Sequence, residues 1–218
     1  MPQRLIFFDR PWSDSEYAID FWFQRNCSVM EVKGKPVSYV DGKIIPWDVA
    51  QEVGMSDRNI RRSVRKLEDT ILNHANNSGE ISDIDMGKFD ILEYDMKEDK
   101  TYWRHKFDEG WRFAKVDKKV YDKIYDSMIH SARLRKELVM VLRVYGACKA
   151  INSSFKDPEI TNKVICKTLG VSDHGAKSKH VGKAIEALSD MGVIEYRYKV
   201  TKVTGEQDCR FRKLVHIA

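Results

Sequence analysis

The chain has 218 residues, of which 42% are hydrophobic and 33% are charged, and its formal net charge is +5. This length predicts one large domain or two small ones, and the positive charge favours anionic partners. No run approaches the roughly 20 apolar residues of a membrane span, and the four cysteines form neither a C-x-x-C pair nor a zinc pattern with the histidines. We therefore expect a soluble, cytoplasmic protein with reduced thiols, no membrane association, and no metal or cofactor.

The first predicted element is a helix over residues 13–25. Ser13 and Glu16 match a capping box, in which each side chain bonds the backbone of the other residue. Four apolar residues then follow at helical spacing, namely Tyr17, Ala18, Phe21 and Trp22. This aromatic face fits two roles equally well, an interface in a homodimer or a place in the core of the domain.

Segment 29–45 is predicted to form strands, with turns at the sequences KGKP and DGK. Pro46 favours the first turn of a helix over 46–53, and Gly54 is suited to end that helix. Ser56 or Asp57 can then cap a second helix, which begins with the sequence DRNIRRSVRKL.

The second helix has two opposite faces. At 100° per residue, its apolar side consists of Ile60, Val64 and Leu67. The opposite side consists of Arg58, Arg62 and Arg65, flanked by Arg61 and Lys66. One side therefore anchors the helix in a core, and the other presents a cationic ridge.

Such a ridge suits DNA, because guanidinium groups pair with guanine edges and with phosphates. Residues near the start of a DNA-contacting helix usually reach the bases. We expect base contacts from Arg58, Asn59 and Arg62, with Ser56 at the start of the same surface. Phosphate contacts are expected from Arg61, Arg65 and Lys66. The simpler alternative is a solvated basic face.

The composition becomes strongly acidic in the middle of the chain. Segment 68–99 contains ten acidic residues and two lysines, and HANNSGE at 74–80 predicts a loop. Residues 91–107 predict two strands joined by a turn, and GWRFAKV adds a candidate strand. Helices are predicted over VYDKIYDSMI and over 131–151, where apolar residues at helical spacing predict one long amphipathic helix buried along one stripe.

The end of the chain has a clear element order. Thr161 is expected to cap a helix that runs through Leu169, and Gly170 and Ser172 open a turn. A second helix is predicted from Lys179 to Met191, where Gly192 stops it. Two strands follow, VIEYRYKVT and DCRFRKLVHI, joined by a turn at KVTGEQ.

Two helices, a turn and a β-hairpin resemble the winged helix-turn-helix family of DNA-binding proteins. The resemblance covers about 60 residues and rests on the sequence LGVS…VGKAIEALSDMGVIE. Its turn, VSDHGAKS, is longer than usual for that family. VAQEVGMSDRNIRRSVRKL is similar to an earlier helix-turn-helix, with the hairpin at 91–107 as its wing. Two such units also resemble, more loosely, the tandem winged-helix replication initiators of plasmids and phages.

The resemblance implies an α+β fold with two winged helix-turn-helix domains joined by the long helix. The first is expected over 1–116, with the acidic segment as an insertion, and the second over 117–218. In the second domain, DNA contacts are expected from Lys177, Lys179, His180 and Lys183 at the basic end of the helix. The wing is expected to contribute Arg197, Lys199, Lys202, Arg210 and Arg212, although each alone is nearly as well explained as an ordinary strand residue facing solvent.

Catalysis is not expected. GVSDHGAKS at 170–178 differs from a phosphate-binding loop by one extra residue and follows a predicted helix, whereas such a loop follows a strand. The acidic residues at 80–99 are better explained as a solvated surface than as a magnesium site. The sequence predicts a non-enzymatic, sequence-specific double-stranded-DNA-binding protein acting in transcription control or replication initiation, in a phage or plasmid. The alternative is a protein-interaction module that uses the winged helices as docking platforms.

Overall fold

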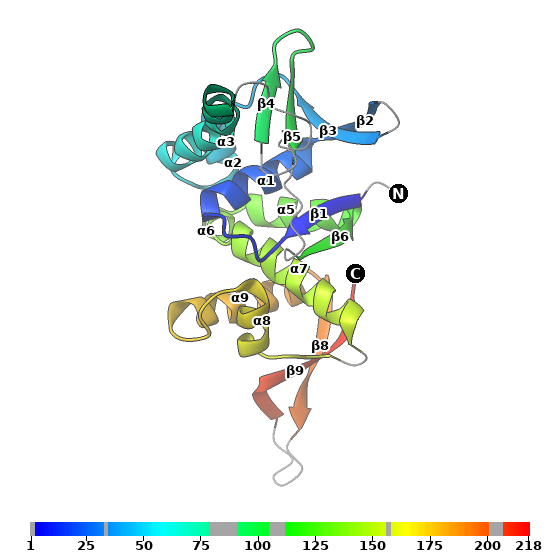
Figure 1. Ribbon diagram of the computed structural model, residues 1–218. Helices are drawn as coiled ribbons and strands as arrows, with labels where there is room; N and C mark the ends of the chain where they lie inside the picture. The colour runs from blue at the N-terminus through cyan, green and yellow to red at the C-terminus, as the bar shows by residue number, and fades with distance from the viewer. Residues whose placement is uncertain (1–2, 33–34, 79–90, 105–111, 156–157, 201–206) are drawn as a thin grey trace. The chain divides into compact units, whose positions relative to one another are not determined.

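A computed structural model of the chain describes residues 3–32, 35–78, 91–104, 112–155, 158–200 and 207–218 (Figure 1). The fold contains both helices and strands and is of the predicted α+β class. The chain divides into two compact units. We call Trp12–Trp111 the inserted unit, and Met1–Pro11 together with Arg112–Ala218 the terminal unit.

A strand pair explains why the first residues belong with the second half of the chain. β1 (Gln3–Phe7) pairs antiparallel with β6 (Phe113–Asp117), so that Ile6 lies opposite Ala114. Both of these side chains are buried. The division differs in this respect from the predicted boundary at 116/117, because the pairing partners are more than 100 residues apart and no local pattern indicates their contact.

The inserted unit has three helices and a four-stranded antiparallel sheet among its described residues. In chain order these are α1 (Asp14–Asn26), β2 (Ser28–Val32), β3 (Lys35–Asp41), α2 (Pro46–Val53), α3 (Asp57–Ser78), β4 (Ile91–Asp95) and β5 (Lys100–Arg104). The strand order is β2-β3-β5-β4. The strand at β3 therefore lies beside the last strand of the unit, and β4 and β5 form a hairpin.

Helix α1 begins with the predicted capping box, since both reciprocal hydrogen bonds between Ser13 and Glu16 are present. Its aromatic residues are packed inside the chain. Tyr17 and Phe21 are buried and lie against each other, and the Phe23 ring lies 5.7 Å from the ring of Trp103 on β5. Of the two roles predicted for this face, these rings have the core role, and the homodimer prediction loses their support.

Helices α2 and α3 are joined by a short turn at Gly54–Ser56. Gly54 has φ 69°, the left-handed conformation in which glycine is least strained, and its N–H donates to the carbonyl of Ala50. Helix α3 continues to Ser78. The predicted loop at 74–80 was therefore wrong for 74–78. Asparagine and serine favour loops only weakly, and an established helix can extend through them.

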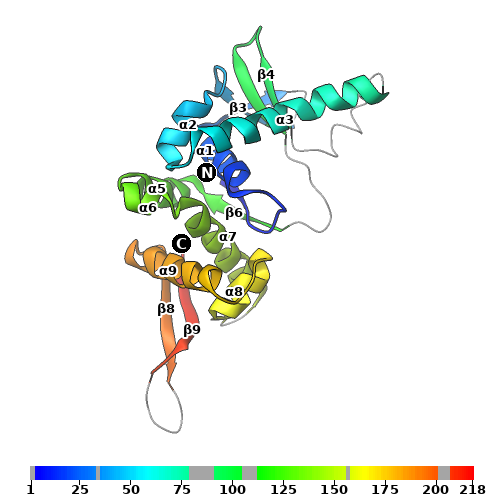
Figure 2. The ribbon, with the colours of Figure 1, turned by 90° about the vertical axis from the view of Figure 1, so that its left-hand side faces the viewer.

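The terminal unit follows the strand β6 with helices and a three-stranded antiparallel sheet. Its further elements are α5 (Lys118–Ile129), α6 (Ala132–Arg135), α7 (Leu138–Ser154), β7 (Glu159–Ile160), α8 (Asn162–Leu169), α9 (Ala176–Asp190), β8 (Ile194–Val200) and β9 (Gln207–Ile217). The strand order is β7-β9-β8. In Figures 1 and 2, β8 and β9 extend away from α8 and α9 as a hairpin.

The predicted long helix at 131–151 is two helices, and the prediction of a single helix was wrong. The chain breaks between α6 and α7, and Leu134 on α6 is 40% exposed. Helix α7 is buried on most sides rather than along one stripe, and it packs against β1, β6, α8 and α9. It is the central helix of the terminal unit, so it does not join the two units.

Helix α9 begins at Ala176, three residues earlier than predicted. Gly175 precedes it with φ 69°, and the turn from Gly170 contains no side-chain cap for the new helix. The usual capping residues in this turn, Ser172 and Asp173, lie too early to mark the start, which explains the error.

The two units repeat one order of elements: helix, strand, helix, turn, helix and hairpin. In the inserted unit this order is α1, β3, α2, α3, β4 and β5, and in the terminal unit it is α7, β7, α8, α9, β8 and β9. In both, the single strand pairs with the second strand of the hairpin. The strand β2 is an addition to the inserted unit alone.

Candidate nucleic-acid interface

Helix α3 has the two faces that its sequence predicts. Ile60 is fully buried, and Val64 and Leu67 are each 3% exposed. Arg58, Arg62 and Arg65 on the opposite side are exposed. Among the described residues none forms a hydrogen bond or an ion pair with these three guanidinium groups. Helix α3 thus presents three guanidinium groups that a partner can contact, while its opposite face is fixed in the core.

The flanking cations of α3 have partners within the protein. Arg61 pairs with Asp57 one turn earlier, with 3.1 Å between Nη2 and Oδ2. Lys66 donates from Nζ to Oε1 of Glu16 at 2.7 Å. Their charges are partly neutralised, so Arg61 and Lys66 are less available as phosphate contacts than Arg65, which was predicted for the same role.

Glu16 is held as a carboxylate by its surroundings. Burial alone would raise the pKa of Glu16, but the hydrogen bonds from Lys66 and from the backbone and side chain of Ser13 outweigh it. The pKa of Glu16 therefore lies below its ordinary value. A capping residue of α1 is in this way also an anchor for the outer side of α3.

The start of α3 is defined by Ser56. Its carbonyl accepts hydrogen bonds from the N–H groups of Asn59 and Ile60, at 3.0 and 3.1 Å. Ser56 and Asn59 are both exposed, next to Arg58 and on the same turn of the helix. Ser56 and the first two turns of α3 thus present a hydroxyl, an amide and three guanidinium groups, of which that of Arg61 is paired with Asp57.

The corresponding helix of the terminal unit presents lysines. Lys177, Lys179 and Lys183 of α9 are exposed, and none has an ion-pair partner among the described residues. His180 is partly covered, and its Nδ1 lies 3.0 Å from Oε2 of Glu137. The structure therefore leaves three of the four predicted residues of α9 open, and pairs the histidine with a carboxylate just before α7.

The wing residues predicted for DNA contact differ in their surroundings. Arg197 is exposed, and Lys199 pairs with Glu159 of β7 at 3.1 Å between Nζ and Oε1. Lys202 and the side chain of Arg210 lie outside the described part of the chain.

Arg212 is a correction to the predicted surface, because it is only 6% exposed. Its guanidinium carbon lies 5.5 Å from the ring centre of Tyr196, and its Nη1 donates to Oδ1 of Asn162 at 3.0 Å. Asn162 in turn donates from Nδ2 to the carbonyl of Ser178 at 3.0 Å. Arg212 thus connects the hairpin to the first residue of α8 and, through it, to α9, which is a structural role. Alternation along the strand does not reveal this inward arginine.

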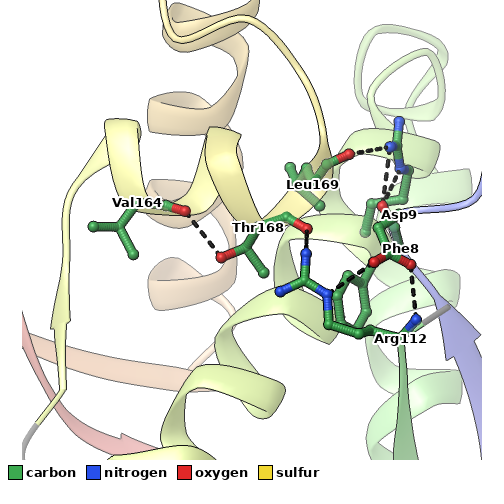
Figure 3. Close-up of polar contacts among 7 residues, drawn as sticks. Phe8, Asp9, Arg112, Val164, Thr168 and Leu169 are labelled. Carbon is green, nitrogen blue, oxygen red and sulfur yellow. Dashed lines mark hydrogen bonds and ion pairs between the residues drawn. The ribbon is translucent and has the colours of Figure 1, made fainter. Parts of the chain in front are cut away.

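Two further arginines hold the end of α8, Arg112 (Figure 3) and Arg143, and neither was among the residues predicted from the sequence. Arg112 donates from Nη2 to the carbonyl of Thr168 at 2.7 Å and from Nε to Asp9 at 2.8 Å. Arg143 is 6% exposed and donates to the carbonyls of Phe8 and Leu169. Cations at a helix C-terminus satisfy its free carbonyls and complement its dipole. An arginine within the apolar run LVMVLRVYG was the available signal.

The described residues bear on two other kinds of site, a phosphate-binding loop and a metal site. The near-match to a phosphate loop at 170–178 follows helix α8 rather than a strand. In the described part of the chain, no group of three histidine, cysteine, aspartate or glutamate side chains is placed to hold a metal, and residues 79–90 of the acidic segment lie outside it. Cys27, Cys148 and Cys166 are buried thiols outside any disulfide, and burial raises the pKa of Cys148 to about 12.

No helix within the described ranges has the length and apolar character needed to cross a membrane. Comparisons of the chain with protein-family models, with curated proteins and with solved structures found no significant match.

Proposed function

We propose that the protein binds double-stranded DNA through two winged helix-turn-helix units, and that α3 of the inserted unit is its main DNA-contacting helix. The observation that carries the proposal is the set of three exposed arginines, Arg58, Arg62 and Arg65, which have no ion-pair or hydrogen-bond partner among the described residues and lie opposite a fully anchored apolar face. A helix of this kind can enter the major groove while its other side holds the domain in place.

The repeated order of elements supports the same proposal. Each unit has a helix pair joined by a turn that opens with a left-handed glycine, Gly54 or Gly170, and each follows it with a β-hairpin. In winged helices the hairpin lies beside the second helix of the pair, where it can reach the DNA backbone. Transcription control and replication initiation, the two roles implied by the sequence resemblance, both require this activity.

The proposal is tested by the salt dependence of binding to a fluorescent duplex of random sequence. Because cationic side chains displace counterions from phosphates, the logarithm of the binding constant should fall linearly with the logarithm of the salt concentration. Binding that is absent, or that does not change between about 50 and 200 mM salt, would refute the proposal.

One observation favours the second candidate function, protein docking. A cavity of about 640 Å³ in the terminal unit lies between the end of α7 and α8. Its lining combines five apolar residues, Ala150, Ile151, Phe155, Pro158 and Val164, with five polar or charged ones, Arg112, Ser154, Glu159, Lys167 and Thr168. Phe155 is 66% exposed there, and Val164 is 39% exposed. A docking module would bind a protein partner with little dependence on salt and would not bind the duplex, so the same titration separates the two functions.

A further inference from the structure

The two second helices, α3 and α9, can be compared position by position through their buried residues. Ile60, Val64 and Leu67 of α3 have the same spacing as Val181, Ile185 and Leu188 of α9, and all six are at most 3% exposed. This correspondence aligns the outward positions of the two helices without any reference to where they begin.

The aligned outward positions carry different chemistry. Arg58 corresponds to Lys179, and Arg62 corresponds to Lys183. Asn59 corresponds to His180, which in the terminal unit lies against Glu137 at 3.0 Å. The position of Arg65 is taken by an exposed carboxylate, Glu186.

The position of Arg61 is occupied by Gly182, which has no side chain to offer. A Cβ at Gly182 would lie 3.1 Å from Nδ2 of Asn162, so the start of α8 covers this side of α9. The outward surface of α9 is therefore narrower than that of α3, as well as different in charge.

These differences suit the two helices to different DNA contacts, base discrimination for α3 and attraction to phosphates for α9. Guanidinium and amide groups make paired hydrogen bonds that distinguish guanine and adenine from other bases. A lysine ammonium is a strongly hydrated point charge that suits phosphate without fixing a planar geometry. On the aligned positions α3 has Arg, Asn and Arg, whereas α9 has Lys, an engaged His and Lys.

We infer that sequence discrimination resides in Arg58, Asn59 and Arg62 of α3, and that α9 supplies sequence-independent attraction to the DNA backbone through Lys179 and Lys183. The inference rests on the proposed duplex-DNA binding and adds a division of labour between the two units. It assigns specificity to the inserted unit alone.

The test begins by selecting bound duplexes from a random pool with the full-length wild-type protein. Dissociation constants are then measured by fluorescence anisotropy on the selected duplex and on a scrambled duplex of the same composition, and their ratio gives the specificity. Two full-length variants are compared, Arg58→Lys with Arg62→Lys, and Lys179→Ala with Lys183→Ala. All four positions are exposed, and circular dichroism checks that each variant is folded.

The arginine-to-lysine variant gives α3 the two lysines that α9 has at the aligned positions and leaves the net charge unchanged. Its specificity ratio should fall about tenfold or more, while its binding to the scrambled duplex and its salt slope stay close to wild type. The lysine-to-alanine variant should bind both duplexes more weakly by a similar factor, with an unchanged ratio and a salt slope reduced by about 1 per lysine.

The inference is overturned if the ratio survives Arg58→Lys with Arg62→Lys, or if it falls in the Lys179→Ala, Lys183→Ala variant. A wild-type protein that binds duplexes with a clear salt dependence but selects no sequence also overturns it, and leaves the proposed function intact. A wild-type protein that binds no duplex at all refutes the proposed function instead.

Discussion

Lys66 on α3 donates a hydrogen bond from Nζ to Oε1 of Glu16 at 2.7 Å, and Glu16 is the capping-box glutamate of α1. One carboxylate therefore closes the start of α1 and also holds a side chain from the third turn of α3. The Glu16 side chain is only 6% exposed while that of Lys66 is 69% exposed, so the carboxylate is buried at this contact and the lysine reaches it from the solvent side.

We predict that Glu16→Ala lowers the free energy of unfolding by about 1 kcal/mol, the usual cost of losing a helix cap. Glu16→Gln should cost less, because glutamine also fits a capping box and only the charge attraction to Lys66 is lost. Chemical denaturation at pH 7 measures both, with Glu186→Gln, an exposed position on α9, as the control. Equal costs for alanine and glutamine would contradict the account of the cap.

The same carboxylate predicts a pH dependence. The pKa of Glu16 is lower in the folded protein than its ordinary value of 4.5, so its ionised form stabilises the fold above that pH. This contribution is lost as the pH falls through the lower, folded value. The difference in unfolding free energy between wild type and Glu16→Gln should thus be largest near neutral pH and shrink below about pH 4.5. A difference that grows on acidification would contradict the assigned direction.

Arg212 is predicted to affect stability. Arg212→Ala removes the hydrogen bond to Asn162 and uncovers the faces of Tyr196 and Tyr198, so the free energy of unfolding should fall by about 1–3 kcal/mol. Arg197→Ala on the neighbouring strand is the matched control, and its exposed side chain should change stability by less than about 0.5 kcal/mol. If Arg212→Ala is as stable as the control, Arg212 does not have the structural role described above.

Gly146 on α7 tests the packing of the N-terminal strand in the terminal unit. A Cβ at this position would lie 2.7 Å from Cγ2 of Ile6, which is closer than side chains tolerate. Gly146→Ala should therefore destabilise the protein by about 1–3 kcal/mol, although alanine normally favours a helix. In a double-mutant cycle, Ile6→Ala should cost less in the Gly146→Ala background than in wild type. Additive effects would show that the two sites are independent.

Much of the order of elements could be predicted because its signals are local. Ser13 with Glu16, Pro46 with Gly54, and Thr161 with Gly170 mark helix ends through contacts within a few residues. The buried and exposed faces of α3 likewise follow from spacing alone.

Features that depend on distant contacts could not be predicted in this way. The pairing of β1 with β6 joins residues more than 100 positions apart, and it determines which unit contains the first strand. Lys66 and Arg212 were predicted to contact DNA because nothing near them in the sequence indicates a partner within the protein. Their partners, Glu16 and Asn162, are each 50 residues away.

The central claim, that α3 contacts DNA, is tested most directly by charge reversal on its exposed face. Arg58→Glu with Arg62→Glu is compared with Arg133→Glu and Lys136→Glu, an equal change in net charge at exposed positions around α6. Fluorescence anisotropy with a duplex at about 100 mM salt should show near-complete loss of binding for the α3 variant and a small loss for the control, with both proteins folded. Equal affinities for the two variants would contradict the claim, because the effect would then come from net charge and not from α3.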